Sequence, residues 1–167
     1  LAKATPPEHP DAAALARAVS EVEGVASHIN EHIRERENLV KMREVEREFR
    51  HERLTDNPSR TFVLRGDLVK KSRKADQTCH FLLFSDVLMY VHARGALVAS
   101  KSARRLDLTT CRVDGQPRNV DASEASVAFD VVSESKSFRV VAPTEADKNA
   151  WVKALQDDPR EIFRAAA

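Results

Sequence analysis

Apolar side chains recur every three or four positions through the first third of the chain, with charged residues between them. This spacing is typical of an amphipathic α-helix. Pro10 followed by Asp11 suits a helix start, because proline fits the first turn and an acidic side chain there favours the helix dipole. No further proline follows until Pro58, so we expect one helix over about residues 10–53. Its apolar positions are Leu15, Val19, Val22, Ala26, Ile29, Ile33, Val40, Val45 and Phe49.

A helix of this length would extend about 65 Å, roughly twice the width of a small domain. The remaining residues are too few to cover most of its apolar stripe. The stripe therefore either pairs with a second copy of the chain or belongs to a helical bundle whose other helices are missing here. A break in the apolar rhythm at Arg36 argues against a continuous coiled coil.

The pattern changes after Pro58 to short runs rich in β-branched and aromatic residues, separated by polar, turn-prone stretches. Such runs predict strands, and seven of them are present. They cover residues 61–70, 78–84, 87–92, 104–109, 111–114, 127–132 and 137–142. The longest irregular connection between them is residues 115–126.

One more helix is expected after the last strand, which Pro143 ends. Thr144 and Asp147 form a start that resembles a capping box, and the buried face would carry Trp151, Ala154 and Leu155. Seven antiparallel strands closed by a single amphipathic helix indicate an α+β fold, a small barrel or sandwich with the helix plugging one open end.

Composition narrows the class of protein. The chain has 167 residues, of which 32% are charged and 42% hydrophobic, which fits one folded domain with an appended segment. No run approaches the roughly 18 apolar residues of a membrane span, and the N-terminus lacks the pattern of a secretory signal, so we expect a soluble, cytoplasmic chain. Cys79 and Cys111 are too few for a disulfide framework or a four-cysteine zinc site.

Charge is distributed unevenly. Lys and Arg number 27 and Asp and Glu 26, but the net charge is −2 over residues 1–53, +6 over residues 54–112 and −3 over residues 113–167. A basic excess confined to the middle favours a local anionic contact, such as a phosphorylated lipid headgroup, over nucleic-acid binding. A solvated basic strand face is the alternative.

Three ordered motifs carry a resemblance to a pleckstrin-homology domain: LRGDLVK at residues 64–70, FLLFSDVLMY at residues 81–90, and residues 144–155 with their single Trp151. The first third resembles the last helix of a Dbl-homology domain, the catalytic half of Rho-family guanine-nucleotide exchange factors. That resemblance rests on KATPPEHPD at residues 3–11, followed by Leu15, Ala18 and the pair Ile29-Asn30. The expected domains are a truncated Dbl-homology helix (1–54), a linker (55–60), a pleckstrin-homology domain (61–158) and a tail (159–167).

The Dbl-homology resemblance implies a GTPase partner and a limit on what this chain can catalyse by itself. Exchange in that family uses an acidic residue from an early helix, with a lysine and an asparagine near the end of the bundle. Lys3 and Asn30 match the lysine and the asparagine, and we expect them to contact a Rho-family GTPase in the intact parent protein. The acidic residue has no counterpart in this chain, so the fragment should not catalyse exchange alone. No cofactor is implied.

The pleckstrin-homology resemblance implies a lipid site that is only half present. Lys70 matches the first-strand lysine of phosphoinositide-binding members, but Thr78 and His80 stand where two basic side chains would begin the second strand. Other basic residues form a wider surface at Lys71, Arg73, Lys74, Lys101, Arg104 and Arg105. Spread-out charge gives weak, salt-sensitive attraction to anionic membranes without headgroup selectivity, hence peripheral membrane association.

One further motif is the H-x-x-E-H pattern of a zinc-peptidase class, at residues 28–32. A third ligand is needed and no other motif of that class is present, so no metal site is expected. With only 4 glycines there is no nucleophile elbow or glycine-rich phosphate loop, and no catalytic site is assigned. Two function classes remain: a regulatory, membrane-targeting module of an exchange factor, or a free-standing scaffold or adaptor that dimerises through the helix stripe.

Overall fold

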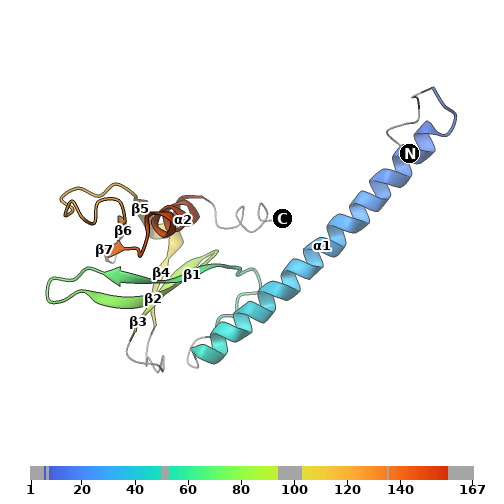
Figure 1. Cartoon of the computed structure of the whole chain (residues 1–167). Coiled ribbons are helices and arrows are strands. Elements are labelled where there is room, and N and C mark those ends of the chain that lie inside the picture. Colours follow the sequence, from blue (N-terminus) through green and yellow to red (C-terminus); the bar gives the residue numbers. More distant parts are fainter. Residues whose placement is uncertain (1–5, 7, 50–52, 94–102, 135, 158–167) are drawn as a thin grey trace. The chain divides into compact units, whose positions relative to one another are not determined.

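The computed structural model describes residues 6, 8–49, 53–93, 103–134 and 136–157 (Figure 1). The chain divides into two compact units, residues 1–40 and 41–167. Helix α1 (Ala12–Glu48) runs from the first unit into the second. The long helix expected from the apolar spacing is confirmed, and it ends five residues before the expected limit near residue 53.

The apolar stripe of α1 is exposed within the first unit. Val22 is 67% exposed and Ile29 is 52% exposed, although side chains of this kind are usually buried. The exposed set comprises Val19, Val22, Val25, Ile29, Ile33, Leu39 and Val40. Exposed apolar patches larger than a few hundred Å² are rare on monomeric proteins, so this stripe is a candidate interaction surface.

The second unit contains a seven-stranded antiparallel sheet with the order β4-β3-β2-β1-β7-β6-β5. Its strands are β1 (Phe62–Lys70), β2 (Gln77–Phe84), β3 (Val87–His92), β4 (Arg104–Asp107), β5 (Cys111–Asp114), β6 (Ala128–Ser133) and β7 (Phe138–Val141). Strand β4 ends two residues before the expected limit. There Asp107 accepts a hydrogen bond from the Thr109 amide and starts the 3-10 turn η2 (Leu108–Thr110).

Helix α2 (Glu145–Gln156) closes this sheet. Its start is as expected, because the Thr144 hydroxyl accepts a hydrogen bond from the Asp147 amide at 3.1 Å. Strands β1 and β7 pair at only two positions, and α2 packs against β1, β5 and β6. Trp151 is 3% exposed and its ring centroid lies 6.2 Å from that of Phe81. A Cβ added at Gly66 would lie 3.4 Å from the Trp151 indole nitrogen, an ordinary van der Waals contact, so the Trp151 side chain packs directly over β1 at this position.

Strands β2 and β3 bury both of their faces. On the inner face, Phe81 and Tyr90 belong to the barrel core. On the outer face, Leu82, Phe84, Val87, Met89 and Val91 pack with Met42, Val45, Phe49 and Leu54 from the end of α1 and the segment after it. Double burial explains why FLLF and VLMY are continuous apolar runs instead of alternating ones.

A carboxylate holds the segment that joins α1 to the sheet. Glu46 Oε1 accepts hydrogen bonds from the Leu54 amide at 2.6 Å, the Thr55 amide at 2.7 Å and the Thr55 hydroxyl at 2.8 Å. Further along, Arg60 donates two hydrogen bonds of 2.7 Å to Asp86, in the turn between β2 and β3. These contacts fix the end of α1 to the sheet at both ends of the connecting segment.

Replacing Trp151 with alanine should destabilise the barrel by about 3–5 kcal/mol, because it empties the centre of the core under α2. Urea unfolding followed by far-UV circular dichroism measures this loss. Val132→Ala, at a side chain that is 43% exposed, is the control and should change stability little. An unchanged unfolding midpoint for Trp151→Ala would exclude the packing described above.

Glu46 gives the connecting segment a pH dependence. The hydrogen bond from the Thr55 amide, with those from the Thr55 hydroxyl and the Leu54 amide, lowers the pKa of the Glu46 carboxyl from its ordinary value of 4.5. The stabilisation is therefore complete above the unfolded-state pKa and is lost as pH falls through the lower folded-state pKa. Glu46→Ala should cost about 1 kcal/mol at pH 7. Denaturant unfolding of both proteins at several pH values should show this difference shrinking below about pH 4.5; a constant difference would contradict the assignment.

Candidate functional site

A buried lysine lies where β1 ends, at the end of the barrel that we call its mouth. Lys70 is the last residue of β1 and is only 7% exposed. Its amino group lies 5.1 Å from the ring centroid of Phe138 and 5.6 Å from that of Tyr90. Aromatic faces attract cations, so the two rings offset part of the cost of burying this charge.

Two more cations belong to the same end of the barrel. Arg104 is directly opposite Tyr90 in the β3–β4 pairing, and residues directly opposite share a face of a sheet. Lys136 lies two residues before Phe138. Burial lowers the pKa of Lys70, and repulsion from Lys136 and Arg104 lowers it further. We call Lys70, Arg104 and Lys136 the mouth cluster.

The mouth cluster carries an excess of positive charge. Among the residues that the structure describes, no carboxylate forms an ion pair with any of its three members. Their mutual repulsion and the depressed pKa of Lys70 would both be relieved by an anion placed between them. The arrangement is therefore suited to binding an anionic group from solution or from a surface.

His80 does not join this cluster. It pairs with Asp67 across the β1–β2 ladder, and its Nδ1 meets the Asp67 carboxylate. Lys70 pairs with Gln77, which lies three positions from His80 on β2. Side chains an odd number of positions apart on a strand face opposite sides, so Lys70 and His80 lie on opposite faces of the sheet. Lys70 and His80, which the sequence placed among the candidate residues for an anionic surface, therefore do not share a face of the sheet. The β2 positions on the same face as Lys70 are Gln77 and Cys79.

Arg105 also lies on the other face, because it is opposite Met89, whose side chain is in the outer cluster. Arg73 and Lys74 are exposed in the connection between β1 and β2. Asn30 is exposed on α1. Lys3 and Lys101 lie outside the described residues.

Lys71 has a different environment from its neighbour Lys70. Its amino group forms ion pairs with Asp76 at 2.8 Å and with Glu124 at 2.7 Å, and these partners raise the pKa of Lys71 well above its ordinary value. Its charge is therefore balanced within the fold. Lys71 therefore adds little to an anion site, although the sequence analysis counted it in the wider basic surface.

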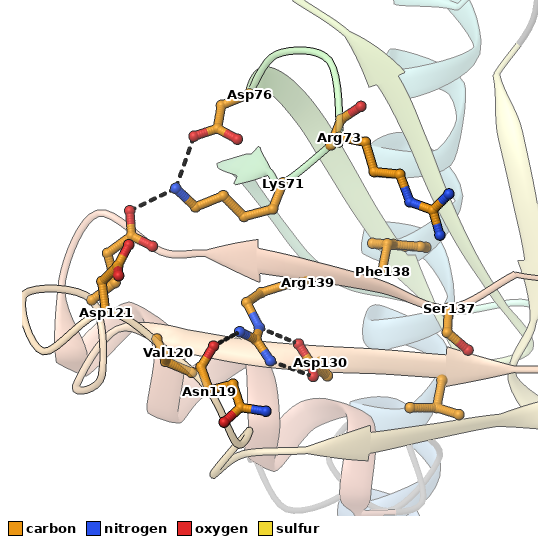
Figure 2. Close-up of a pocket in the computed structure, with 13 residues that line it drawn as sticks. Lys71, Arg73, Asp76, Asn119, Val120, Asp121, Asp130, Ser137, Phe138 and Arg139 are labelled. Carbon is orange, nitrogen blue, oxygen red and sulfur yellow. Dashed lines mark hydrogen bonds and ion pairs between the residues drawn. The ribbon is translucent and has the colours of Figure 1, made fainter.

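A cavity of about 590 Å³ surrounds the Lys71 ion pairs (Figure 2). In its wall Arg139 binds Asp130 through two nitrogens, at 2.8 and 3.0 Å, and donates to the carbonyl oxygens of Arg118 and Asn119, each at 2.8 Å. The lining residues include four carboxylates, against three cations. The carboxylates are Asp76, Asp121, Glu124 and Asp130, and the cations are Lys71, Arg73 and Arg139. Because its cations are already paired or outnumbered, this cavity is a poor anion site.

Sequence reasoning missed Lys136 and the two rings around Lys70. The available signal was the spacing of Lys136 and Phe138, which puts a basic residue two positions before a strand aromatic. None of the described helices is both long and apolar enough to cross a bilayer. The described residues also contain no group of three or more histidine, cysteine or acidic side chains placed to hold a metal ion.

Comparison with known proteins extends over both parts of the chain. The family model described as "PH domain" matches residues 62–158. The rat protein named "FYVE, RhoGEF and PH domain-containing protein 4" is 30% identical over 154 residues, covering 90% of this chain and 20% of its own length. The mouse "Phosphatidylinositol 3,4,5-trisphosphate-dependent Rac exchanger 1 protein" is 26% identical, covering 93% of this chain and 11% of its own. The chain thus spans about a fifth or less of these two relatives.

Solved structures show the same fold. The linker-DH/PH domains of p115-RhoGEF superpose with a TM-score of 0.67 at 20% identity, covering 95% of this chain and 48% of that one. The DH/PH fragment of PDZRHOGEF, solved in complex with human RhoA, gives a TM-score of 0.59 at 20% identity, covering 98% of this chain and 49% of that one. Since the family model covers more than half of the residues, this chain belongs to the PH domain family, with a long helix ahead of the domain as in the DH/PH fragments of RhoGEF proteins.

Proposed function

We propose that this chain is the regulatory and membrane-targeting module of a Rho-family guanine-nucleotide exchange factor. In this proposal α1 is the last helix of the catalytic Dbl-homology bundle, and Lys3 and Asn30 contact a Rho-family GTPase when the bundle is complete. The support is that similarity to RhoGEF-named relatives extends over 90% of the chain, helix and barrel together. The role proposed for this chain is regulatory and not catalytic, and it requires no cofactor.

The packing of α1 gives this module a means of coupling. Met42, Val45 and Phe49 are buried against the outer face of β2 and β3. A displacement of the barrel would therefore pull on the last turns of the helix. In the intact parent, a membrane contact made by the barrel would in this way constrain the orientation of the bundle.

The mouth cluster is the observation that carries the membrane part of the proposal. Lys70 is buried, has no carboxylate partner among the described residues, and has Arg104 and Lys136 close enough to lower its pKa. Headgroup phosphates would supply the missing negative charge. The β2 positions on the same face, Gln77 and Cys79, carry no cation, so the site has few convergent donors. We therefore infer weak binding to phosphoinositides or other anionic lipids at the cytoplasmic membrane surface, at about 1 kcal/mol per basic residue.

Vesicle co-sedimentation tests this inference. Affinity for vesicles with a fixed fraction of anionic lipid should fall steeply between 50 and 300 mM salt and should differ little among phosphoinositide isomers at matched charge, since screening weakens exposed charge. Arg104→Glu and Lys136→Glu should each weaken binding severalfold. Lys70→Met, which keeps the buried stem, should do the same. Lys71→Met is the matched control, because Lys71 is already paired with Asp76 and Glu124.

A second pair of variants tests the face assignment. Gln77→Arg adds a cation opposite Lys70 and should strengthen binding to phosphoinositide vesicles. His80→Arg adds the same charge on the opposite face and should have a smaller effect. Equal gains from both variants would contradict a localised site, and tight isomer-selective binding by the wild type at high salt would contradict the proposed weak one.

The exposed stripe of α1 favours a second candidate function, a free-standing scaffold or adaptor that self-associates. Val22, Ile29 and Ile33 are each more than half exposed, which is costly for side chains of this size. In the first proposal other helices of the bundle would cover them; in the second, another copy of this chain would do so. Neither proposal involves nucleic acid.

Analytical ultracentrifugation tests whether a second copy of this chain covers the stripe. If the stripe is uncovered, the chain should self-associate in the micromolar range, and Ile29→Asp with Ile33→Asp should return it to a monomer, because charge opposes burial of the stripe. Glu31→Asp, which adds no charge, is the control. A wild-type chain that stays monomeric at high micromolar concentration would rule out the scaffold function. Tight dimers that persist when the upstream helices of a longer parent are present would argue for it.

A further inference from the structure

The first unit carries a pair of histidines that neither proposed function uses. His28 and His32 are four residues apart on α1, so they share a face of the helix. Their Nε2 atoms lie 3.1 Å apart, and the ring planes meet edge to face at 81° with centroids 4.4 Å apart. Both side chains are exposed, so the arrangement is open to solvent.

The separation of the two nitrogens suits a metal ion. Histidine nitrogens bind zinc at about 2.0–2.1 Å, and related first-row divalent ions at similar distances. Two nitrogens 3.1 Å apart would then subtend an angle of about 100° at a shared ion, between the octahedral and tetrahedral values. The sequence alone led us to expect no metal site at this motif, because a peptidase-type zinc site needs a third protein ligand. We propose instead that His28 and His32 form a two-ligand chelating site for a divalent transition-metal ion on the surface of α1.

A neighbouring carboxylate orients one of the two ligands. Glu35 Oε2 lies 3.3 Å from His32 Nδ1. A negative carboxylate at this distance favours a proton on His32 Nδ1, which leaves a lone pair on His32 Nε2 for a metal ion. Carboxylates often hold metal-binding histidines in this way.

Metal binding requires one proton to move. Without metal, one Nε2 donates a proton to the other across the 3.1 Å contact, and the ring tautomers decide which histidine is the donor. When an ion binds, both Nε2 lone pairs are needed, so the donor ring gives up its Nε2 proton to solvent and carries its ring proton on Nδ1 instead.

The site is limited to two protein ligands. The described residues bring no third histidine, cysteine or acidic ligand to this pair, so water fills the remaining positions. Such an ion would clamp one turn of α1 and would not act on a substrate. Divalent ions should follow the usual order of imidazole affinity, with Cu²⁺ above Ni²⁺ and Ni²⁺ above Co²⁺. The proposal depends only on α1 being helical over residues 28–32, and so stands or fails separately from the proposed function.

Metal titration of the untagged full chain tests the site. Cu²⁺, Ni²⁺ and Zn²⁺ would be titrated in competition with a chromophoric chelator, and binding of one ion per chain is expected. His28→Gln and His32→Gln should each lower the affinity at least tenfold, since either change removes one of two ligands. His9→Gln and His80→Gln are the controls and should leave it unchanged, because those side chains lie on other elements.

Two further measurements make the outcome decisive. Circular dichroism of each variant without metal should match the wild type, since both histidines are exposed, so any lost affinity reflects the ligands. Glu35→Gln should weaken binding by up to about tenfold without changing the stoichiometry. The proposal is overturned if the wild type binds no ion, or if the His28 and His32 variants bind as tightly as the wild type.

Discussion

Burial of both faces of β2 and β3 is the interaction on which the rest of the second unit depends. Phe81 and Tyr90 fill the barrel from one face, while Leu82 and Met89 receive the end of α1 on the other. A strand buried on both faces cannot shift its register without exposing one apolar set and burying the wrong one. The same two strands therefore contribute to the barrel core with one face and bind the end of α1 with the other.

This arrangement also determines where a buried charge can be tolerated. The inner face ends at the barrel mouth, where the Lys70 amino group lies over two aromatic rings and the residue keeps a small exposed fraction of 7%. A lysine further inside the barrel would have no such outlet and would lose its proton or destabilise the fold. At the mouth it remains available, together with Arg104 and Lys136, to an anion approaching from outside.

Lys70 and Lys71 have opposite roles because side chains at adjacent positions along a strand point to opposite faces of the sheet. In the part of the chain that the structure describes, Lys70 has no carboxylate partner, whereas Lys71 forms ion pairs with two. Lys71 ties the β1–β2 connection to the segment before β6 and thereby shapes the cavity of about 590 Å³. Carboxylates outnumber cations in the lining of that cavity, so the three cations of the mouth cluster are the better candidate site for phosphate.

The elements of this chain were predictable from sequence because local spacing encodes them. Apolar residues every three or four positions predicted α1, and runs of β-branched and aromatic residues predicted the seven strands. Thr144 and Asp147 predicted the start of α2. The face of each site residue was not predictable, since an error of one position in pairing moves a side chain across the sheet, as happened for His80. Nor did the sequence show that Glu124, 53 positions from Lys71, would neutralise it. Local periodicity determined which helices and strands form, and long-range pairing in the folded chain decided which cations remain free to bind.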